Sequence, residues 1–257
     1  MKLTLLALAA VAALGTAGMA QAAPIKVGVA AEPYPPFSSP DASGKWSGWE
    51  IDLMNAICAD QKLDCVVTPV AWDGIIPALT SGQIDMIMSS MSITAEREKV
   101  IDFSDKYYVT PAALAVAKDS SIAATVDGLK GKVIGVQVST TNEAYAKKFY
   151  SKTSTIKEYQ TQDEVNQDMA AGRIDADLAD QFTLEAFLDS ADGKACCKSL
   201  GALPYDNETL GTGIGAGLRK SDTELKAKIN KGIADIRANG TYDAITKKYF
   251  NFNIYGG

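Results

Sequence analysis

Apolar residues occur in two patterns along this chain. Short continuous apolar runs are typical of buried strands, and stretches with an apolar residue every three or four positions are typical of amphipathic helices. The runs predict strands over residues 24–30, 65–70, 84–88, 133–138, 156–159 and 176–179. The periodic stretches predict helices over 51–60, 75–80 and 142–150, another from the capping-box pattern of Thr161 and Glu164, and a last one that opens with Ser221 and Glu224. Because strands alternate with single helices, we predict an α/β protein with parallel sheets.

A weak internal repeat divides this pattern into two units. The segment Ser81–Asp85 (SGQID) returns as Ala171–Asp175 (AGRID). The segment Lys26–Val29 (KVGV) returns as Lys132–Val136 (KVIGV). Both echoes occur in the same order, which favours two similar lobes over a chance match.

The repeat also suggests where the lobes begin and end. We expect residues 23–109 together with 210–257 to form the first lobe, and residues 110–209 to form the second. The extended stretch 107–117 would cross between the lobes, and the chain would return over 207–213. Two crossings by extended segments form a hinge.

The first 22 residues have the pattern of a cleaved secretory signal. Lys2 precedes an apolar run, and Ala20-Gln21-Ala22 forms a cleavage site of small residues. A membrane anchor is the alternative, but polar and glycine residues interrupt the run short of the ~20 apolar residues that a span needs. Cleavage would also remove Lys2, which leaves 24 basic and 31 acidic residues and a net charge of −7. We therefore predict a soluble protein that is exported to an oxidising compartment.

Net charge and the lack of histidine exclude several classes of function. The whole chain carries a net charge of −6, whereas binding to nucleic acid phosphates favours a basic surplus. It contains no histidine, so catalytic triads and histidine-ligated metal sites are excluded. We expect a monomer that binds no nucleic acid and uses no metal or cofactor.

The four cysteines agree with an exported protein. Cys58 lies near the end of a predicted helix and Cys65 opens a strand, so the two suit a local disulfide. Two unpaired buried thiols are the alternative. Cys196 and Cys197 are adjacent, and a bridge between neighbours would be strained, so the state of this pair stays open.

Candidate binding residues cluster just after the predicted strand ends. In open α/β sheets, ligands bind beyond the carboxyl ends of the strands, so these side chains are expected to face one cleft. They include hydroxyls, two aromatic rings, an arginine and an aspartate, which together suit a small zwitterion. The candidate ligand-binding residues are Glu32, Tyr34, Trp72, Ser89, Ser90, Ser92, Arg97, Gln137, Thr141, Asn142 and Asp180.

Arg97 and Asp180 carry opposite charges on opposite lobes. Arg97 falls in the first turn of a helix that Thr94 would start, where the helix dipole disfavours a cation. Its position is explained either by ion pairs with Glu96 and Glu98 or by a role in binding a ligand carboxylate. Asp180 follows a strand whose end should point at the cleft, where it could pair with an ammonium group, although a solvated loop acid is the usual role of an aspartate. A ligand held by both residues would join the lobes.

Several stretches of this chain resemble a known family. They are Tyr34–Phe37, Gly48–Leu53, Ile84–Thr94 with Arg97, Lys130–Thr141, Gly172–Asp175, Lys248–Phe250 and Tyr255–Gly257. The combination is similar to the polar amino-acid-binding proteins of bacterial ABC importers (solute-binding protein family 3), in the lysine/arginine/ornithine- and histidine-binding branch, over essentially the whole mature chain. The resemblance implies the type II periplasmic-binding-protein (Venus-flytrap) fold, with two Rossmann-like lobes joined by a two-strand hinge. It also implies a location in the periplasm and a membrane-embedded ABC permease as partner.

The resemblance assigns roles to the candidate residues. Arg97 and Thr141 would bind the α-carboxylate of an amino acid. Ser92, Asp180 and the backbone of Ser90 would bind its α-ammonium group. Tyr34 and Trp72 would flank its side chain. The spacing of Cys58 and Cys65 also matches the disulfide of that branch.

The side-chain preference follows from the same region. Tyr34 and Trp72 would form a slot for a guanidinium group or a methylene stem, and Glu32 would supply the opposing charge. We therefore predict a basic amino acid, namely arginine, ornithine or lysine, with arginine favoured. The chain departs from the family pattern at Gln137, where an apolar residue is expected, and at Ser139, where glycine is expected.

Three alternatives remain at this stage. Trp72-Asp73-Gly74 is also similar to the opine-binding branch, which makes octopine a second candidate ligand. An exported dehydratase of the cyclohexadienyl type would use the same arginine and could take Glu32 or Asp180 as its acid. A ligand-sensing receptor ectodomain would need a membrane span, which no later stretch supplies. We expect a carrier that catalyses no reaction.

Overall fold

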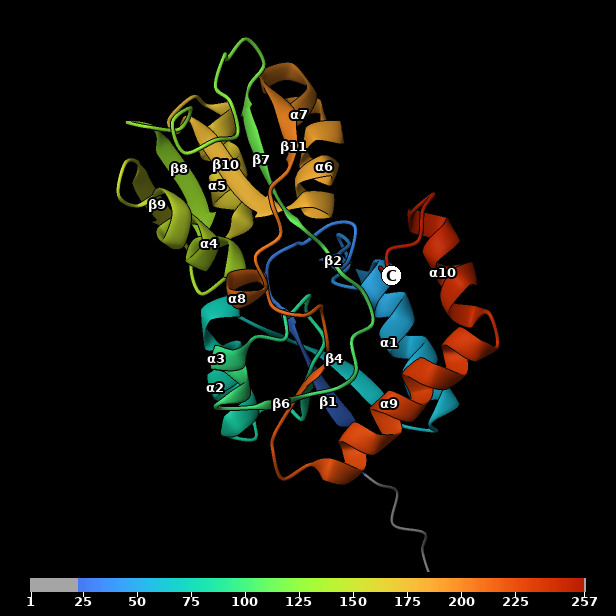
Figure 1. Ribbon diagram of the computed structural model, residues 1–257. Coiled ribbons are helices and arrows are strands. Elements are labelled where there is room, and N and C mark those ends of the chain that lie inside the picture. The colour runs from blue at the N-terminus through green and yellow to red at the C-terminus, as the bar shows by residue number, and fades with distance from the viewer. Residues whose placement is uncertain (1–22, 257) are drawn as a thin grey trace, which may run out of the picture.

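Two five-stranded sheets form the framework of the computed structural model, which describes residues 23–256 (Figure 1). The predicted signal peptide, residues 1–22, lies outside the described residues. We call the first sheet with its helices lobe I and the second sheet with its helices lobe II. In the described part of the chain, no helix combines the length and apolar character needed to cross a membrane.

The sheet of lobe I has the strand order β4-β1-β5-β12-β6. Its strands are β1 (Ile25–Ala30), β4 (Cys65–Val70), β5 (Met86–Ile87), β6 (Asp102–Phe103) and β12 (Gly217–Leu218). Strand β1 runs parallel to β4 and β5, whereas β12 runs antiparallel to both of its neighbours. A separate small hairpin pairs β2 (Ser39–Pro40) with β3 (Trp46–Ser47).

The sheet of lobe II has the strand order β11-β7-β10-β8-β9. Its strands are β7 (Ala112–Ala117), β8 (Val133–Gln137), β9 (Thr155–Tyr159), β10 (Ala176–Asp180) and β11 (Cys197–Ala202). Strand β8 runs parallel to β9 and β10, and β7 runs antiparallel to β10 and β11. The prediction of purely parallel sheets is therefore wrong. In each described sheet the reversed strand is the first one after a crossing between the lobes, and it enters the sheet without the helical crossover that parallel neighbours require.

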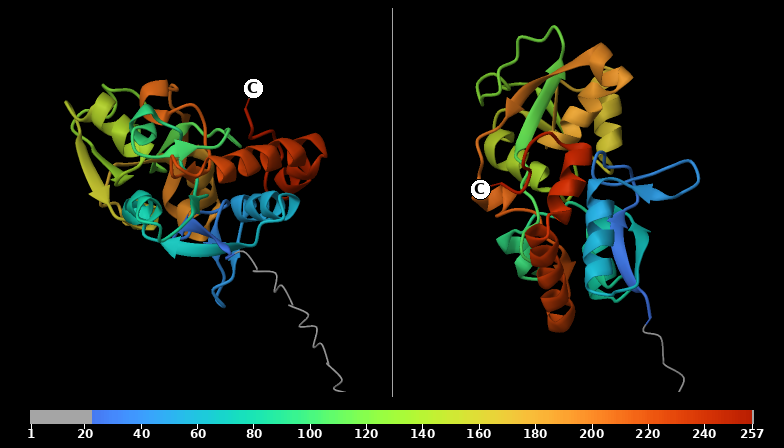
Figure 2. Two further views of the ribbon diagram at one scale, coloured as in Figure 1. Left: turned by 90° about the horizontal axis from the view of Figure 1, so that it is seen from below. Right: turned by 90° about the vertical axis from the view of Figure 1, so that its right-hand side faces the viewer.

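Helices cover both faces of each sheet. In lobe I they are α1 (Trp49–Asp60), α2 (Ile75–Thr80), α3 (Ala95–Glu98), α9 (Thr223–Ala238) and α10 (Thr241–Tyr249), with a 3-10 turn at Trp72–Gly74. In lobe II they are α4 (Thr141–Tyr150), α5 (Gln162–Ala170), α6 (Gln181–Asp189) and α7 (Ala191–Cys196). Figure 2 shows α9 and α10, in red, beside α1, and these three helices pack on one another.

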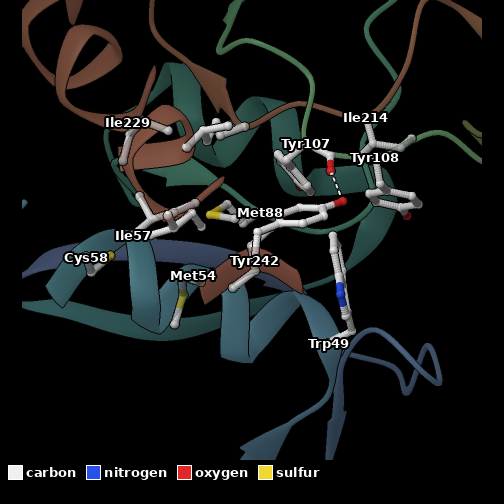
Figure 3. Close-up of a cluster of buried hydrophobic side chains, with 14 of the residues drawn as sticks. Trp49, Met54, Ile57, Cys58, Met88, Tyr107, Tyr108, Ile214, Ile229 and Tyr242 are labelled. Carbon is white, nitrogen blue, oxygen red and sulfur yellow. Dashed lines mark hydrogen bonds between the residues drawn. The ribbon is translucent and has the colours of Figure 1, made fainter. Parts of the chain in front are cut away.

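The main core of lobe I lies under α1, α9 and α10 (Figure 3). Its centre is an aromatic cluster in which Trp49 stacks edge-on against Tyr108 and Tyr242. Two polar atoms of this cluster are paired, because the Tyr242 hydroxyl donates to the Tyr107 carbonyl at 2.7 Å and the Trp49 indole donates to Thr246 at 3.1 Å. The buried Tyr108 hydroxyl has no partner among the described residues. The two paired groups fix the positions of these rings in the core.

The internal repeat has the same structural role in both lobes. The Asp85 carboxylate accepts the backbone N–H of Lys26 at the start of β1, and the Asp175 carboxylate accepts that of Val133 at the start of β8, each at 2.9 Å. The glycine of each repeated strand also faces the isoleucine of the repeat. A Cβ at Gly28 would lie 2.3 Å from Ile84, and one at Gly135 would lie 2.6 Å from Ile174. The two copies of the repeat therefore make the same contacts in both lobes.

Two segments cross between the sheets, shown in green and orange in Figure 1. They are hydrogen-bonded to each other where they leave lobe I, since Tyr107 donates to the Ile214 carbonyl at 2.8 Å and Ile214 donates to that of Tyr108 at 2.9 Å. The return segment is not wholly extended as predicted, because it contains α8 (Asn207–Leu210), which the Asp206 side chain caps. The lobe boundaries 109/110 and 209/210 stay a prediction.

The end of the chain differs from the prediction in two ways. The expected last helix does not open with a capping box at Ser221; it begins at Thr223, and its cap residue Asp222 makes no side-chain cap bond. A second helix, α10, follows it after Gly240, which has a φ of 81° in the left-handed region that glycine adopts without strain. The predicted capping box of Thr161 and Glu164 is confirmed.

Both cysteine pairs are bonded in the structure. Cys58 and Cys65 form the predicted disulfide between the last turn of α1 and the start of β4. Cys196 and Cys197, whose state the sequence left open, also form a disulfide, at the junction of α7 and β11.

Candidate ligand-binding site

The eleven candidate residues line one cavity between the lobes. Lobe I contributes Glu32, Tyr34, Trp72, Ser89, Ser90, Ser92 and Arg97, and lobe II contributes Gln137, Thr141, Asn142 and Asp180. In lobe I they come from the loops after β1 and β5, from the 3-10 turn after β4 and, for Arg97, from helix α3. In lobe II they come from the end of β8, the first turn of α4 and the end of β10. Carboxyl ends of strands from both sheets therefore meet here, as the sequence pattern predicts.

Arg97 spans the gap between the lobes. Its guanidinium donates to the Ser92 carbonyl in lobe I at 3.0 Å and to the Ser139 carbonyl in lobe II at 3.1 Å. It also lies over the Trp72 ring, 5.5 Å from the centroid. Glu96 forms its ion pair with Lys99 instead, so pairing with a neighbouring glutamate does not explain Arg97. Loss of hydration lowers the pKa of Arg97 to about 10, and Asp180 opposes this shift, so the guanidinium is charged at neutral pH.

The first turn of α4 faces the same cavity. Thr140 caps this helix by accepting the Glu143 N–H at 3.0 Å, and Thr141 and Asn142 are its first residues. Helix N-termini attract anions because their first N–H groups lack partners in the helix. Ser139, just before the cap, has a φ of 60°, which explains why the family pattern has glycine there.

Asp180 forms the acidic end of the site. Only 7% of it is exposed, so it is not a solvated loop acid. Its carboxylate accepts the Tyr34 hydroxyl from lobe I at 2.7 Å and the Asn142 amide at 3.0 Å. Burial raises the pKa of Asp180, while the hydrogen bonds from Asn142 and Tyr34 and the charge of Arg97 oppose the rise.

The serine loop after β5 closes the floor of the cavity. The Ser89 hydroxyl accepts the Ala30 N–H at 2.8 Å, which ties this loop to the end of β1. The Ser92 hydroxyl lies 3.4 Å from that of Thr141, so the two lobes also meet at this point. In the same loop, Ser90 has a φ of 53°.

Glu32 and Gln137 form another bridge between the lobes. The Gln137 amide donates to the Glu32 carboxylate at 2.7 Å and to the Gln160 carbonyl at 3.0 Å. Gln137 is 5% exposed, so a polar side chain at this usually apolar position is satisfied by these two contacts. It fixes the position of the Glu32 carboxylate.

Two buried polar atoms of the cavity lining have no partner among the described residues. They are the indole N–H of Trp72, a donor, and the side-chain oxygen of Asn142, an acceptor. The cavity therefore offers a polar ligand one free donor and one free acceptor.

Two members of the lining, Ala30 and Thr140, are not among the eleven candidates. Ala30 has no functional side chain to signal it. Thr140 could have been found, because Thr140 and Glu143 have the spacing of a helix cap and its third residue. Across residues 23–256, no group of three or more His, Cys, Asp or Glu side chains is arranged to hold a metal ion.

The arrangement separates charge across a single cavity. Arg97 and the N-terminus of α4 supply positive potential, whereas Asp180 and Glu32 supply carboxylates. A sequence profile of the bacterial extracellular solute-binding proteins, family 3, matches residues 25–252. The chain belongs to this family.

Two relatives of this family-3 solute-binding protein match it over their whole length. The lysine/arginine/ornithine-binding periplasmic protein of Escherichia coli is 43% identical, and the histidine-binding periplasmic protein of Salmonella typhimurium is 42% identical, each over 100% of both chains. These relatives are named as binding proteins and as periplasmic. A solved ancestral arginine-binding protein bound to arginine is 36% identical with a TM-score of 0.81, over 88% of this chain and 98% of that one. The predicted type II periplasmic-binding-protein fold is confirmed.

Proposed function

We propose that this protein captures a basic amino acid, with arginine favoured, in the periplasm and delivers it to an ABC importer in the membrane. The observation that carries the proposal is the single cavity with Arg97 and the α4 N-terminus on one side and the buried Asp180 on the other. A free amino acid has an α-carboxylate and an α-ammonium group, which are complementary to Arg97 and Asp180. The relatives that bind arginine, lysine and ornithine support the same ligand class.

The α-carboxylate would be bound by Arg97 and by Thr141 at the start of α4. A planar guanidinium can donate two parallel hydrogen bonds to a carboxylate. The carbonyls of Ser92 and Ser139 hold Arg97 in place, and the Trp72 ring supports it. This preorganisation reduces the entropy that Arg97 loses on binding.

The α-ammonium group would be bound by Asp180, by Ser92 and by the backbone of Ser90. The Tyr34 hydroxyl keeps its proton, because burial and Asp180 raise its pKa well above the ordinary value. It therefore remains a donor that holds the Asp180 carboxylate in position. The free side-chain oxygen of Asn142 supplies another acceptor beside Asp180.

The cationic side chain would lie between Tyr34 and Trp72 and face Glu32. Aromatic rings stabilise a guanidinium or ammonium group by about 0.5–2 kcal/mol. Gln137 holds the Glu32 carboxylate from lobe II, so the side-chain end of the site also depends on both lobes.

Octopine fits this lining less well than arginine does. Octopine has a second carboxylate, whereas Arg97 is the one Lys or Arg in the described cavity lining. A second anion would face Glu32 or Asp180 without a cation to pair with it. A dehydratase is likewise disfavoured, because the carboxylates of the cavity are held by donors rather than placed beside a free proton-transfer partner.

A thermal-shift panel tests the proposed function. The purified mature protein, stripped of ligand by unfolding and refolding, is heated with arginine, lysine, ornithine, histidine, glutamine, glutamate or octopine. We expect arginine, ornithine and lysine to raise the Tm most. Largest stabilisation by glutamine or glutamate would contradict the proposal, and so would conversion of prephenate or arogenate to an aromatic product.

A further inference from the structure

Glu50 is a buried carboxylate next to the binding site but outside its lining. It lies in the first turn of α1 and is 0% exposed. Its donors are the backbone N–H of Ser90, 2.9 Å from each carboxylate oxygen, the Ser90 hydroxyl at 3.1 Å, and the Tyr107 hydroxyl. Two of these three donor groups belong to one residue of the cavity, Ser90.

Ser90 has a backbone conformation that needs support. Its φ of 53° lies in the left-handed region, where the Cβ of a residue other than glycine crowds its own backbone. Such a conformation persists only where the surroundings fix it. The Glu50 carboxylate supplies that fixation, because it binds both the N–H and the hydroxyl of Ser90.

Glu50 is itself anchored to the core of lobe I. Tyr107 donates its hydroxyl to Glu50 and its N–H to the Ile214 carbonyl at 2.8 Å. Its own carbonyl accepts the Tyr242 hydroxyl at 2.7 Å (Figure 3). Burial raises the pKa of Glu50, and the hydrogen bonds from Tyr107 and Ser90 oppose the rise. The chain of contacts therefore runs from the aromatic core through Glu50 to the floor of the cavity.

We propose that Glu50 is a positioning residue for ligand binding, which holds Ser90 in the left-handed conformation that presents its backbone to the ligand's α-ammonium group. Glu50 does not touch the ligand and acts through Ser90. This inference rests on the proposed function, because it requires Ser90 to contact an amino acid.

A double-mutant cycle tests the inference. Arginine affinity is measured by calorimetry for the wild type, Glu50→Leu, Ser90→Gly and the double variant, with folding checked by circular dichroism. Leucine removes both acceptor oxygens at similar volume, and we expect it to weaken binding about tenfold or more. Glycine adopts the left-handed conformation without Glu50, so in the Ser90→Gly background the same substitution should cost less than about threefold.

Two further variants control the cycle. Glu50→Gln keeps one acceptor oxygen and should lose measurably less affinity than Glu50→Leu does. Asp177→Asn changes a carboxylate of lobe II that is equally buried, at 0% exposure, and should leave affinity within about twofold. If Glu50→Leu does not fold, Glu50→Gln takes its place in the cycle, with a smaller expected loss that again disappears in the Ser90→Gly background.

The outcomes separate the two proposals. An equal loss in both backgrounds would overturn the role of Glu50 while leaving the proposed function intact. A wild-type protein that binds none of the basic amino acids would overturn the proposed function and this inference with it.

Discussion

Arg97 is the residue on which the account depends most. A cation in the first turn of a helix is disfavoured by the helix dipole, by about 0.3–1 kcal/mol. The structure nevertheless holds this side chain in the cavity with two carbonyls and the Trp72 ring. A residue kept in an unfavourable place by several contacts is typical of a functional site.

Arg97→Ala should abolish binding and leave the fold intact. Breaking a charge pair in a closed cavity leaves a ligand carboxylate buried and unpaired, which costs on the order of 3–5 kcal/mol. The expected loss in affinity is roughly 200- to 5,000-fold by calorimetry. Arg173→Ala is the matched control, because Arg173 is an exposed arginine that pairs with Asp168. A loss under tenfold in Arg97→Ala would show that Arg97 does not hold the ligand carboxylate.

Asp177 should make stability depend on pH without affecting the site. It is fully buried, its only described side-chain donor is Gln162, and burial raises its pKa to about 7 from the ordinary 3.8. The folded state therefore favours the protonated form, and stability falls as pH rises from about 4 to about 7. At roughly 1.4 kcal/mol per pKa unit, the full effect above pH 7 is at most about 4 kcal/mol.

The Asp177→Asn variant measures this effect by urea denaturation at pH 5 and pH 8. We expect it to be more stable than the wild type at pH 8 and to gain less, or nothing, at pH 5. Asp127→Asn, an exposed carboxylate of the same lobe, should show no such difference. The opposite result would be a wild type whose free energy of unfolding rises from pH 5 to pH 8, with Asp177→Asn abolishing that rise. It would show that ionisation of Asp177 stabilises the fold, which contradicts the prediction.

At the scale of elements, the Cys58–Cys65 disulfide clips α1 to β4. Closing this short loop constrains the unfolded chain, and the chain-entropy model gives about 2–3 kcal/mol of stability. Cys58→Ala with Cys65→Ala should therefore lose about that much free energy of unfolding in urea titrations. Cys196→Ala with Cys197→Ala is the comparison, because that bridge closes a much shorter loop. Equal losses in the two double variants would argue against the loop-closure explanation.

The sequence predicted the elements better than their directions. The repeat segments ending at Asp85 and Asp175 and the cap at Thr161 were readable because they are local patterns. Strand direction leaves no local signal, so the reversed β7 and β12 were missed. Helices α6, α7 and α10 were also missed, and α10 continues from α9 with only Gly240 to mark the break.

The site was predictable because its residues follow strand ends. The topology of parallel strands brings such residues together, and all eleven candidates do line one cavity. The partners of these residues were not predictable, since contacts such as Gln137 with Glu32 join positions far apart in the chain. Glu50 was missed for the same reason, because its role lies in a contact with Ser90 that only the fold creates.

At the scale of the whole molecule, contacts across the cavity join the lobes. Arg97 reaches Ser139, and Tyr34 reaches Asp180. A ligand that bonds to Arg97 and Asp180 together would add to these contacts and favour the closed form. We therefore expect hinge closure about the two crossing segments.

Small-angle scattering with and without arginine measures this closure. The radius of gyration should be smaller with arginine present. The Arg97→Ala variant serves as control and should show no change at the same arginine concentration. An unchanged radius in the wild type that binds arginine would indicate a rigid or permanently closed protein.

Calorimetric titration of the ligand-free protein with arginine and with agmatine, which is arginine without its carboxylate, tests whether Arg97 holds the carboxylate of an amino acid in the cavity. Micromolar affinity needs only about 0.7 kcal/mol from each non-hydrogen atom of arginine, below the ceiling of about 1.5. We expect arginine to bind with micromolar or tighter affinity and agmatine to bind at least about 100-fold more weakly, because agmatine leaves Arg97 unpaired. Equal affinity for the two compounds, or no binding of arginine, would contradict a site in which Arg97 and Asp180 hold an amino acid between two lobes.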